Sequence, residues 1–342
     1  MTRATTGRSW VSKPQRTTVH GGPLSPIGGG SEPWDAVCVG ETMALLTPEP
    51  HQPGTPPRFH ADIGGAESNV AVHLARAGRS VVWYSALGDD RFGRWIHERL
   101  SAEGVNCVVR TDDDRSTGLY TKEPHPRGTR VRYWRRGSAA STLHRDDAAQ
   151  VWRSRPRLVH TSGITAALSE SAAGLVEELM KAAPEGTLRS FDVNYRPALH
   201  GDHNADRLLD LARCSDIVFC GLDEGQALWG VDSVEELADL LRGPEVVVIK
   251  QGAEGATALR DGELWFEPAP TVEVVEPVGA GDAFAAGFLD RFLNGAPIPA
   301  CLAEGARSAG TVLGVHGDIP PREVPSPVDW ETGTTPAQGS RP

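Results

Sequence analysis

Short apolar runs alternate with helical patterns through most of this 342-residue chain, and this alternation restricts the fold more than any other feature. Most of the runs are apolar at successive positions, as strands covered on both faces are. Helical patterns such as residues 170–183 and 234–242 separate them. We therefore predict an α/β fold with a doubly wound, mainly parallel sheet flanked by helices, whose ligands bind outside the carboxyl ends of the strands. Strands are expected at residues 34–46, 80–88, 157–163, 188–194, 216–221 and 245–252.

Residues 117–136 depart from this rhythm. The segments "TGLYTKEP" and "TRVRYWRRGSA" alternate polar and apolar residues around "HPRG", which is typical of an antiparallel hairpin. We expect this hairpin to form a small β-sheet lid over the strand ends. Residues 55–65, which include "FHADIGG", are expected to join it.

The two ends of the chain differ in composition from the rest. Residues 1–33 and 323–342 are rich in Ser, Thr, Gly and Pro and have no hydrophobic periodicity, so we expect a disordered extension and a disordered tail. A transit peptide is the alternative for the first segment, but it lacks an amphipathic stripe. Residues 34–322 are expected to form one domain.

Charge and cysteine content exclude several classes of function. The chain has 34 Lys and Arg against 45 Asp and Glu, a net charge of -11, which argues against a nucleic-acid partner. No apolar run approaches the roughly 18 residues of a membrane span. The five cysteines are scattered, without a C-x-x-C pair, so neither a disulfide framework nor a zinc site is indicated. We expect a cytoplasmic protein.

The strongest local signal for chemistry is "VVEPVGAGDAFAAGFLDRFL" near the C-terminal end. Gly279, Ala280 and Gly281 leave the backbone uncovered where a helix begins, so several amides can point at one anion. Asp282 follows in the first helical turn. One interpretation is a helix cap. The other is phosphoryl transfer, in which the amides stabilise the moving group and Asp282 accepts the proton of the attacking hydroxyl.

Two arginines suit a carboxylate ligand. Alternation along the strand places Tyr133 and Arg135 on one face, and Arg196 follows the strand at residues 188–194. Two neighbouring arginines can bind a carboxylate through charge-assisted hydrogen bonds. The alternative is a solvated strand, because other arginines, Arg130, Arg132 and Arg136, surround Arg135.

Two long motifs together resemble the ribokinase family of carbohydrate kinases, of the phosphofructokinase-B type. A Walker A loop, a protein-kinase motif set and a G-x-G-x-x-G after the first strand are all absent. The first motif matches the N-terminal signature of the family and contains Gly64, Gly65, Ala66, Asn69, Ala71, Gly78 and Gly88. The second motif, "EPVGAGDAFAAGFL", looks like the C-terminal signature of the family.

The resemblance implies a mechanism and a set of cofactors. In such kinases the Gly279–Gly281 amides form the anion hole and the following Asp282 is the general base. ATP is expected along the segment after the strand at 245–252 and at the anion hole, with contacts from Lys250, Gly252, Glu254, Gly255, Gly279, Ala280 and Gly281. Magnesium is expected near Glu224, although Gly221 replaces the Asn of the family's N-x-x-E motif. Glu276 replaces the usual Asp or Asn beside a potential K⁺ site.

Three further segments look like the 2-keto-3-deoxygluconate kinase branch: "GLYTKE", "YWRRGSAAS" and "DVNYRPALH". Trp134 replaces a usual Tyr and His200 a usual Trp. With "GGAESNVA", the resemblance assigns substrate binding to Gly64, Gly65, Asn69, Tyr120, Tyr133, Arg135, Arg196 and Asp282. We expect a side chain at Gly65 to weaken sugar binding more than it weakens the fold.

The sequence thus predicts an ATP- and Mg²⁺-dependent kinase for the 6-hydroxyl of 2-keto-3-deoxygluconate, and we expect a homo-oligomer. The alternatives are a kinase for a neutral ketose such as fructose, or for another sugar acid. A non-catalytic sugar or nucleotide sensor would have lost Asp282 or the glycines, and a nucleoside kinase would need a base-stacking pocket instead of paired arginines.

Overall fold

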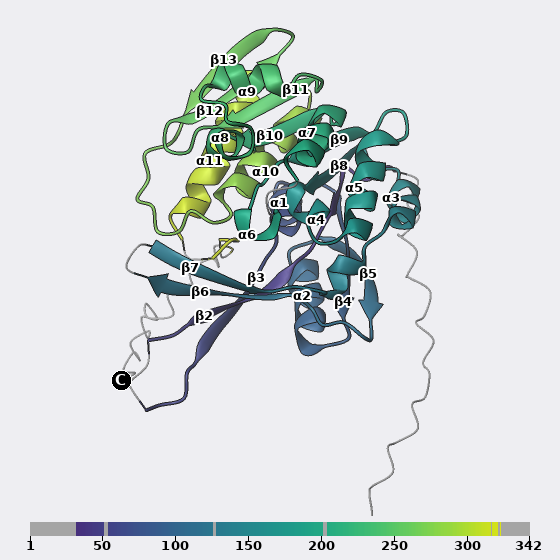
Figure 1. Cartoon of the computed structure of the whole chain (residues 1–342), viewed down its shortest axis with the longest axis vertical. Helices are drawn as coiled ribbons and strands as arrows, with labels where there is room; N and C mark the ends of the chain where they lie inside the picture. Colours follow the sequence, from purple (N-terminus) through teal and green to yellow (C-terminus); the bar gives the residue numbers. More distant parts are fainter. Residues whose placement is uncertain are drawn as a thin grey trace, which may run out of the picture.

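The computed structural model describes residues 32–50, 54–125, 128–200, 204–315, 317–320 and 322. Apart from residues 32 and 33, the extension and tail expected at residues 1–33 and 323–342 lie outside the described residues. Two sheets and the helices that cover them make up the structure (Figure 1). Within the described ranges no helix combines the length and apolar character needed to cross a membrane.

The larger sheet contains nine strands of the described chain, in the order β13-β12-β11-β10-β9-β8-β1-β4-β5. Every neighbouring pair from β11 to β5 is parallel, whereas β12 and β13 are antiparallel. This arrangement confirms the doubly wound, mainly parallel α/β fold. The strands are β1 (Ala36–Val39), β4 (Val81–Gly88), β5 (Asn106–Asp112), β8 (Leu158–Ser162), β9 (Leu188–Asp192), β10 (Ile217–Gly221), β11 (Val246–Lys250), β12 (Gly255–Arg260) and β13 (Glu263–Pro268).

Each face of the large sheet has its own apolar core. Successive residues of a strand point to opposite faces, so Ala36 and Cys38 of β1 enter one core and Val37 and Val39 enter the other. This is why the strands are apolar at successive positions. The first core is closed by α1 (Ala66–Arg76), α2 (Arg91–Ala102), α10 (Ala280–Leu293) and α11 (Ile298–Leu313). The second is closed by α3 (Ala148–Arg153), α5 (Glu170–Lys181), α7 (Ala205–Cys214), α8 (Leu222–Trp229) and α9 (Val234–Leu240). Two short helices, α4 (Gly163–Ala166) and α6 (Pro197–His200), follow β8 and β9.

The smaller sheet confirms the expected β-sheet lid. Its order is β3-β2-β6-β7, and Figure 1 shows it below the large sheet. The β2–β3 and β6–β7 pairs are antiparallel, and the β2–β6 pair is parallel. Met43, Leu45 and Tyr120 form its apolar cluster. The strands are β2 (Met43–Pro48), β3 (Phe59–Gly64), β6 (Leu119–His125) and β7 (Gly128–Trp134).

Three details differ from the sequence expectation. The run at residues 34–46 is two strands, because the chain leaves the large sheet after β1 and enters the small sheet as β2. The strands β5, β12 and β13 were not expected. β5 and β13 are the two edge strands of the large sheet, where a strand need not be apolar on both faces, and β12 lies next to β13. Arg135 lies one residue beyond the end of β7 rather than within the strand.

Candidate active site

Helix α10 begins at a backbone conformation that favours glycine. Gly279 precedes the helix with φ of 87°, in the left-handed region. A Cβ at this position would lie 2.8 Å from the carbonyl oxygen of Asp318, so both the dihedral angle and the close approach require glycine. The first amides of a helix have no partner within it, and the positive end of the helix dipole lies there. The start of α10 at Ala280 and Gly281 can therefore hold an anion of phosphate size.

Asp282 lies in the first turn of α10 and contacts a side chain from a different part of the fold. Asn69 of α1 donates a hydrogen bond of 2.7 Å from Nδ2 to Oδ2 of Asp282. Removal from water raises the pKa of Asp282 to about 7, and the charges of Asp192 and Asp318 act in the same direction. The Asn69 hydrogen bond and the positive charge of Lys250 oppose them. A carboxyl group with this pKa can accept a proton near neutral pH.

The raised pKa of Asp282 predicts an acid limb in the pH profile. We expect kcat/KM to fall as the pH drops through about 7, because protonated Asp282 cannot accept the hydroxyl proton. Asn69→Ala should move the midpoint to higher pH, since the lost hydrogen bond favours the ionised carboxylate. The measurement is kcat/KM from pH 5.5 to 9, with Asn294→Ala at the far end of α10 as the control. An unchanged midpoint in Asn69→Ala would contradict the assignment.

Gly64 and Gly65 join β3 to α1 where other parts of the protein come very close. A Cβ on Gly64 would lie 2.0 Å from the hydroxyl oxygen of Tyr120. A Cβ on Gly65 would lie 2.2 Å from the carbonyl oxygen of Glu41 and 2.9 Å from the Cα of Thr42. Protein backbone therefore fills the position that we expected to be left for a sugar. We therefore expect the opposite order of effects at Gly65: a side chain there should weaken the fold more than it weakens sugar binding.

Gly65→Ala should lower the free energy of unfolding by about 1–3 kcal/mol, because the new methyl group overlaps the Glu41 backbone, which cannot rotate away. Gly174→Ala is a matched control. Gly174 lies within α5, and a Cβ there meets nothing within 4 Å, so this variant should be as stable as the parent or more stable. Urea unfolding of the three proteins checks the prediction. Equal stability of the two variants would contradict this prediction and would show that the backbone at Glu41 moves to make room for the methyl group.

Arg135 and Arg196 approach the same region from the two sheets. Arg135 is largely buried, with Nη2 2.5 Å from Oε2 of Glu41, and its Nε has no hydrogen-bond partner among the described residues. Arg196 is half exposed, 3.6 Å from Oε1 of Glu224. The backbone amide of Arg196 donates to Nδ1 of His200 at 3.0 Å. Burial lowers the pKa of His200, and the positive charges of Arg196 and Arg135 act in the same direction.

Tyr120 and Tyr133 stack on each other with ring centroids 5.7 Å apart. Tyr120 is buried in the small sheet and donates its hydroxyl hydrogen to Asp318 at 3.0 Å. Tyr133 is 45% exposed, and the guanidinium carbon of Arg135 lies 5.8 Å from its ring centroid. Tyr133 thus has an exposed ring beside Arg135, and the stacked ring of Tyr120 packs against it.

Lys250 lies at the centre of the site. It is the last residue of β11, and its Nζ donates to Asp192 at the end of β9, at 2.8 Å from Oδ2 and 3.1 Å from Oδ1. A Cβ on Gly281 would lie 3.5 Å from this Nζ. Burial opposes the charged form, but the carboxylates of Asp192 and Glu224 raise the pKa of Lys250 above its usual range. The ammonium group is therefore charged beside the start of α10.

The other residues expected at the nucleotide lie in the turn from β11 to β12. The amide of Gln251 donates to the carbonyl oxygen of Gly255 at 2.8 Å and closes this turn. Gly252 has φ of 59° and Gly255 φ of 141°, and a Cβ on Gly255 would lie 2.1 Å from the carbonyl oxygen of Glu267. Glu254 is exposed. The predicted segment thus divides into an exposed turn and a half-buried Lys250.

The described residues fit a magnesium ion only in part. They contain no cluster of three or more His, Cys, Asp or Glu side chains that could hold a metal by themselves. Glu224 lies in the first turn of α8, and its Oε2 accepts a hydrogen bond of 2.7 Å from the amide of Gly221. Magnesium bound with a nucleotide takes one or two carboxylates and several phosphate oxygens and waters. Glu224 fits this limited role.

The region around Glu276 does not fit a potassium ion. Glu276 is buried, and Nζ of Lys122 lies 3.6 Å from its Oε2. The same ammonium group lies 2.7 Å from Oδ1 of Asp318. Lys122 already supplies a buried positive charge to both carboxylates, so a second cation there would be repelled.

Several residues of the site were not predicted, namely Glu41, Lys122, Asp192 and Asp318. Asp192 could have been predicted from the sequence. It lies near the carboxyl end of a predicted parallel strand, as Lys250 does, and the carboxyl ends of such strands share one edge of the sheet. Glu41, Lys122 and Asp318 come from the crossing to the small sheet, from β6 and from the segment after α11. Their meeting depends on how the two sheets pack.

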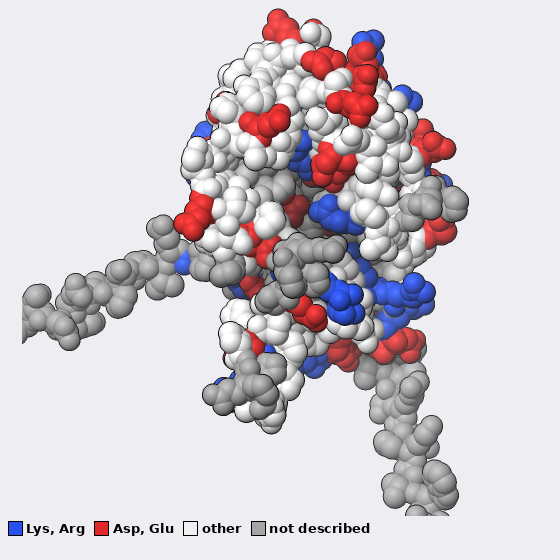
Figure 2. Space-filling model, turned by 60° about the vertical axis from the view of Figure 1, so that its left-hand side comes forward, with Lys and Arg blue, Asp and Glu red and all other residues white. Residues whose placement is uncertain are grey.

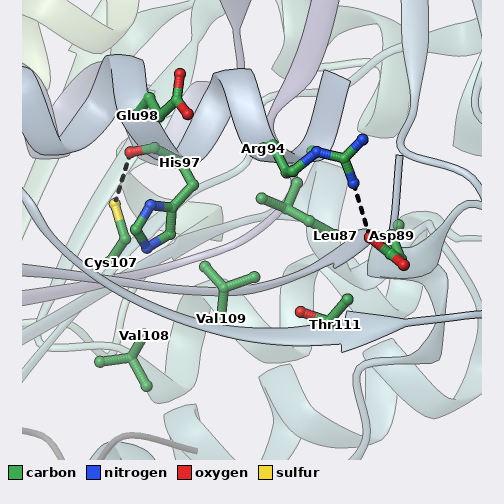
Figure 3. A pocket seen from close by; sticks show the side chains of 11 residues that line it. Leu87, Asp89, Arg94, His97, Glu98, Cys107, Val108, Val109 and Thr111 are labelled. Carbon is green, nitrogen blue, oxygen red and sulfur yellow. Dashed lines mark hydrogen bonds and ion pairs between the residues drawn. The ribbon is translucent and has the colours of Figure 1, made fainter. Parts of the chain in front are cut away.

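Charged groups are visible in the hollow between the larger upper part and the smaller lower part of the molecule in Figure 2. A separate cavity of about 330 Å³ lies between α2 and the edge strand β5 (Figure 3). Arg94 and Asp89 pair across its rim at 2.8 Å, and the Cys107 thiol is directed at the carbonyl oxygen of His97. None of the residues assigned to the active site lines this cavity.

Comparisons with known proteins identify the family of the chain. Residues 35–325 match the family described as pfkB family carbohydrate kinase. The chain is 36% identical over 294 residues to the 2-dehydro-3-deoxygalactonokinase of Haloferax volcanii, covering 83% of this chain and 92% of that protein. It is 36% identical over 318 residues to the 2-dehydro-3-deoxygluconokinase of Thermoproteus tenax, covering 88% and 96%. The crystal structure of a PfkB protein from Polaromonas sp. JS666 superposes with a TM-score of 0.73 at 34% identity, over 81% of this chain and 94% of that one. The chain therefore belongs to the pfkB family of carbohydrate kinases.

Proposed function

We propose that this kinase transfers the γ-phosphoryl group of ATP to the 6-hydroxyl of 2-keto-3-deoxygluconate. The observation that carries the proposal is the presence of two arginines with free donor capacity in a kinase of this family: Arg135, whose Nε has no hydrogen-bond partner among the described residues, and Arg196, which is half exposed. Two guanidinium groups match the carboxylate of a sugar acid, and a neutral ketose has no such group. The names of the relatives from Thermoproteus tenax and Bacillus subtilis support the same substrate.

Buried polar atoms without partners support a polyhydroxyl ligand. The side-chain oxygens of Asn69 and Asn194 are buried and have no hydrogen-bond partner among the described residues. Asn194 also has φ of 42°, a conformation that costs free energy and is typical of ligand sites. Unpaired buried polar groups are costly, so sugar hydroxyls that pair with them would gain affinity. Gly64, Gly65, Tyr120 and Tyr133 are proposed to shape the same pocket.

In the proposed mechanism Asp282 accepts the proton of the 6-hydroxyl while the amides of Gly279, Ala280 and Gly281 stabilise the charge on the phosphoryl group. ATP is proposed to extend from this anion hole past Lys250 to the turn that holds Gly252, Glu254 and Gly255. Magnesium, held by the phosphates and Glu224, would neutralise charge on the triphosphate. The small sheet would exclude water, which otherwise competes for the phosphoryl group.

An ADP-release assay on a panel of sugars tests the proposal. The panel contains 2-keto-3-deoxygluconate, 2-keto-3-deoxygalactonate, fructose, ribose and adenosine. We expect the highest kcat/KM for the 2-keto-3-deoxy acids. The Haloferax volcanii relative makes the galactonate epimer the second candidate, and the ratio of the two acids decides between them. A preference for fructose, ribose or adenosine would contradict the sugar-acid assignment.

We also propose that the enzyme is cytoplasmic and forms homo-oligomers. Free cysteines at all five cysteine positions support a reducing compartment. Phe59 and Trp134 of the small sheet are exposed and support a self-association surface. Sedimentation velocity at several protein concentrations tests the oligomeric state.

A further inference from the structure

We propose that Lys250 is a catalytic residue whose ammonium group binds the transferring γ-phosphoryl group, and that Asp192 positions it. This inference rests on the proposed function and gives Lys250 a specific part in it. It separates Lys250 from Gly252 and Glu254, which lie in the exposed turn beyond the strand, and from Gly255, which begins β12.

The geometry places Lys250 at the anion hole. Its Nζ would lie 3.5 Å from a Cβ on Gly281, the glycine in the first turn of α10. Both carboxylate oxygens of Asp192 accept from the ammonium group, at 2.8 and 3.1 Å. These contacts restrict the position of a flexible lysine side chain. An anion at the start of α10 therefore meets Nζ directly.

The carboxylates around Lys250 also bear on how a phosphate group can bind here. Asp192, Glu224 and Asp282 all interact with the Lys250 charge, and Arg196 lies 3.6 Å from Glu224. These three carboxylates would repel a triphosphate, so a cation must stand between them and the γ-phosphate. Lys250 is the cation next to Gly281, with Nζ 3.5 Å from the position of a Cβ there. Lys122, which is buried, is paired with Asp318 and Glu276 instead.

Phosphoryl transfer from ATP to the sugar requires no reactant besides these two molecules. The bond from the γ-phosphorus to the bridging oxygen breaks, and its electron pair leaves with ADP. The 6-oxygen of the sugar forms the new bond to phosphorus, and its proton passes to Asp282. Lys250 keeps its proton throughout and stabilises the negative charge on the phosphoryl oxygens as the two bonds exchange.

The test compares the affinities for ATP and ADP, because only ATP carries the γ-phosphate. In calorimetric titrations without sugar and with Mg²⁺ present, Lys250→Met should weaken ATP binding about 10- to 100-fold, the loss of a charge-assisted hydrogen bond. ADP binding should change by less than about threefold, since ADP does not reach Lys250. Lys250→Arg keeps the charge and should restore part of the preference for ATP.

Kinetics with the sugar that the parent enzyme phosphorylates best supply the second measurement. Lys250→Met should lower kcat and leave the KM of the sugar nearly unchanged. Asp192→Asn should lower kcat less than Lys250→Met does, because the ammonium group remains but is free to move. Lys181→Met, the same change at the exposed end of α5, is the matched control and should behave as the parent enzyme does.

Lys250→Met leaves the buried carboxylate of Asp192 without a partner and can unfold the protein. The double variant Lys250→Met/Asp192→Asn removes both charges, and circular dichroism checks its fold. A folded double variant that still prefers ATP over ADP as strongly as the parent would overturn the proposal, and so would equal losses for ATP and ADP. The titrations need no sugar, so an inactive parent enzyme on 2-keto-3-deoxygluconate would overturn only the proposed substrate.

Discussion

Asp282→Asn should lower kcat by about 10²- to 10⁴-fold, the usual contribution of a general base. Asn is nearly isosteric with Asp but cannot accept the proton of the 6-hydroxyl. The hydrogen bond from Asn69 can persist, because the amide oxygen of the new side chain is also an acceptor. The sugar KM should therefore stay close to that of the parent enzyme. Steady-state kinetics with saturating ATP give both quantities.

The control for this variant is Asp210→Asn, the same change at an exposed position of α7. It should have parental kcat and KM. If Asp282→Asn keeps a kcat near that of the parent, Asp282 is a helix cap and not the base. If KM rises and kcat does not fall, the carboxylate binds the sugar without taking its proton.

Arg196→Ala should raise the KM for 2-keto-3-deoxygluconate by about 10- to 150-fold, because charge-assisted hydrogen bonds to the substrate carboxylate contribute about 1.5–3 kcal/mol. Arg196 is the better of the two arginines to test. It is half exposed, whereas removal of Arg135 would leave the buried carboxylate of Glu41 unpaired and weaken the fold. The KM for ATP should change little.

Arg242→Ala is the matched control, since this exposed arginine pairs with Asp239, three residues earlier in the chain. A parallel measurement with fructose sharpens the result. The preference for the acid over fructose should fall in Arg196→Ala, because a neutral sugar has no carboxylate to lose. An unchanged KM for the acid would favour the neutral-ketose alternative.

Some parts of the site follow from local sequence. The position of Asp282 in the first turn of α10 depends on a few neighbouring residues, so "GAGD" was sufficient to predict it. Alternation placed Tyr133 and Arg135 on one face of a strand; β7 ends at Trp134, but the Arg135 guanidinium still lies 5.8 Å from the Tyr133 ring centroid. These predictions need only the period of a strand and the geometry of a helix start.

Other parts depend on residues far apart in the chain. The sequence gave no sign that the Glu41 backbone packs against Gly65, and this contact reverses the order of effects that we expect for a side chain there. The possible potassium site beside Glu276 has the ammonium group of Lys122, from β6 of the small sheet, 3.6 Å from that carboxylate. Both contacts join residues that are far apart in the chain.

The sequence alone determined the two-faced parallel sheet, the small hairpin sheet and the anion-binding start of α10, because these follow from periodicity and from glycine next to a helix. Only the tertiary structure decided the electrostatics of the site. The pKa of Asp282 near 7 depends on Asn69, Asp192, Asp318 and Lys250, which come from α1, β9, the segment after α11 and β11. Charge interactions depend on distance and on removal from water, and the fold sets both for residues that are remote along the chain.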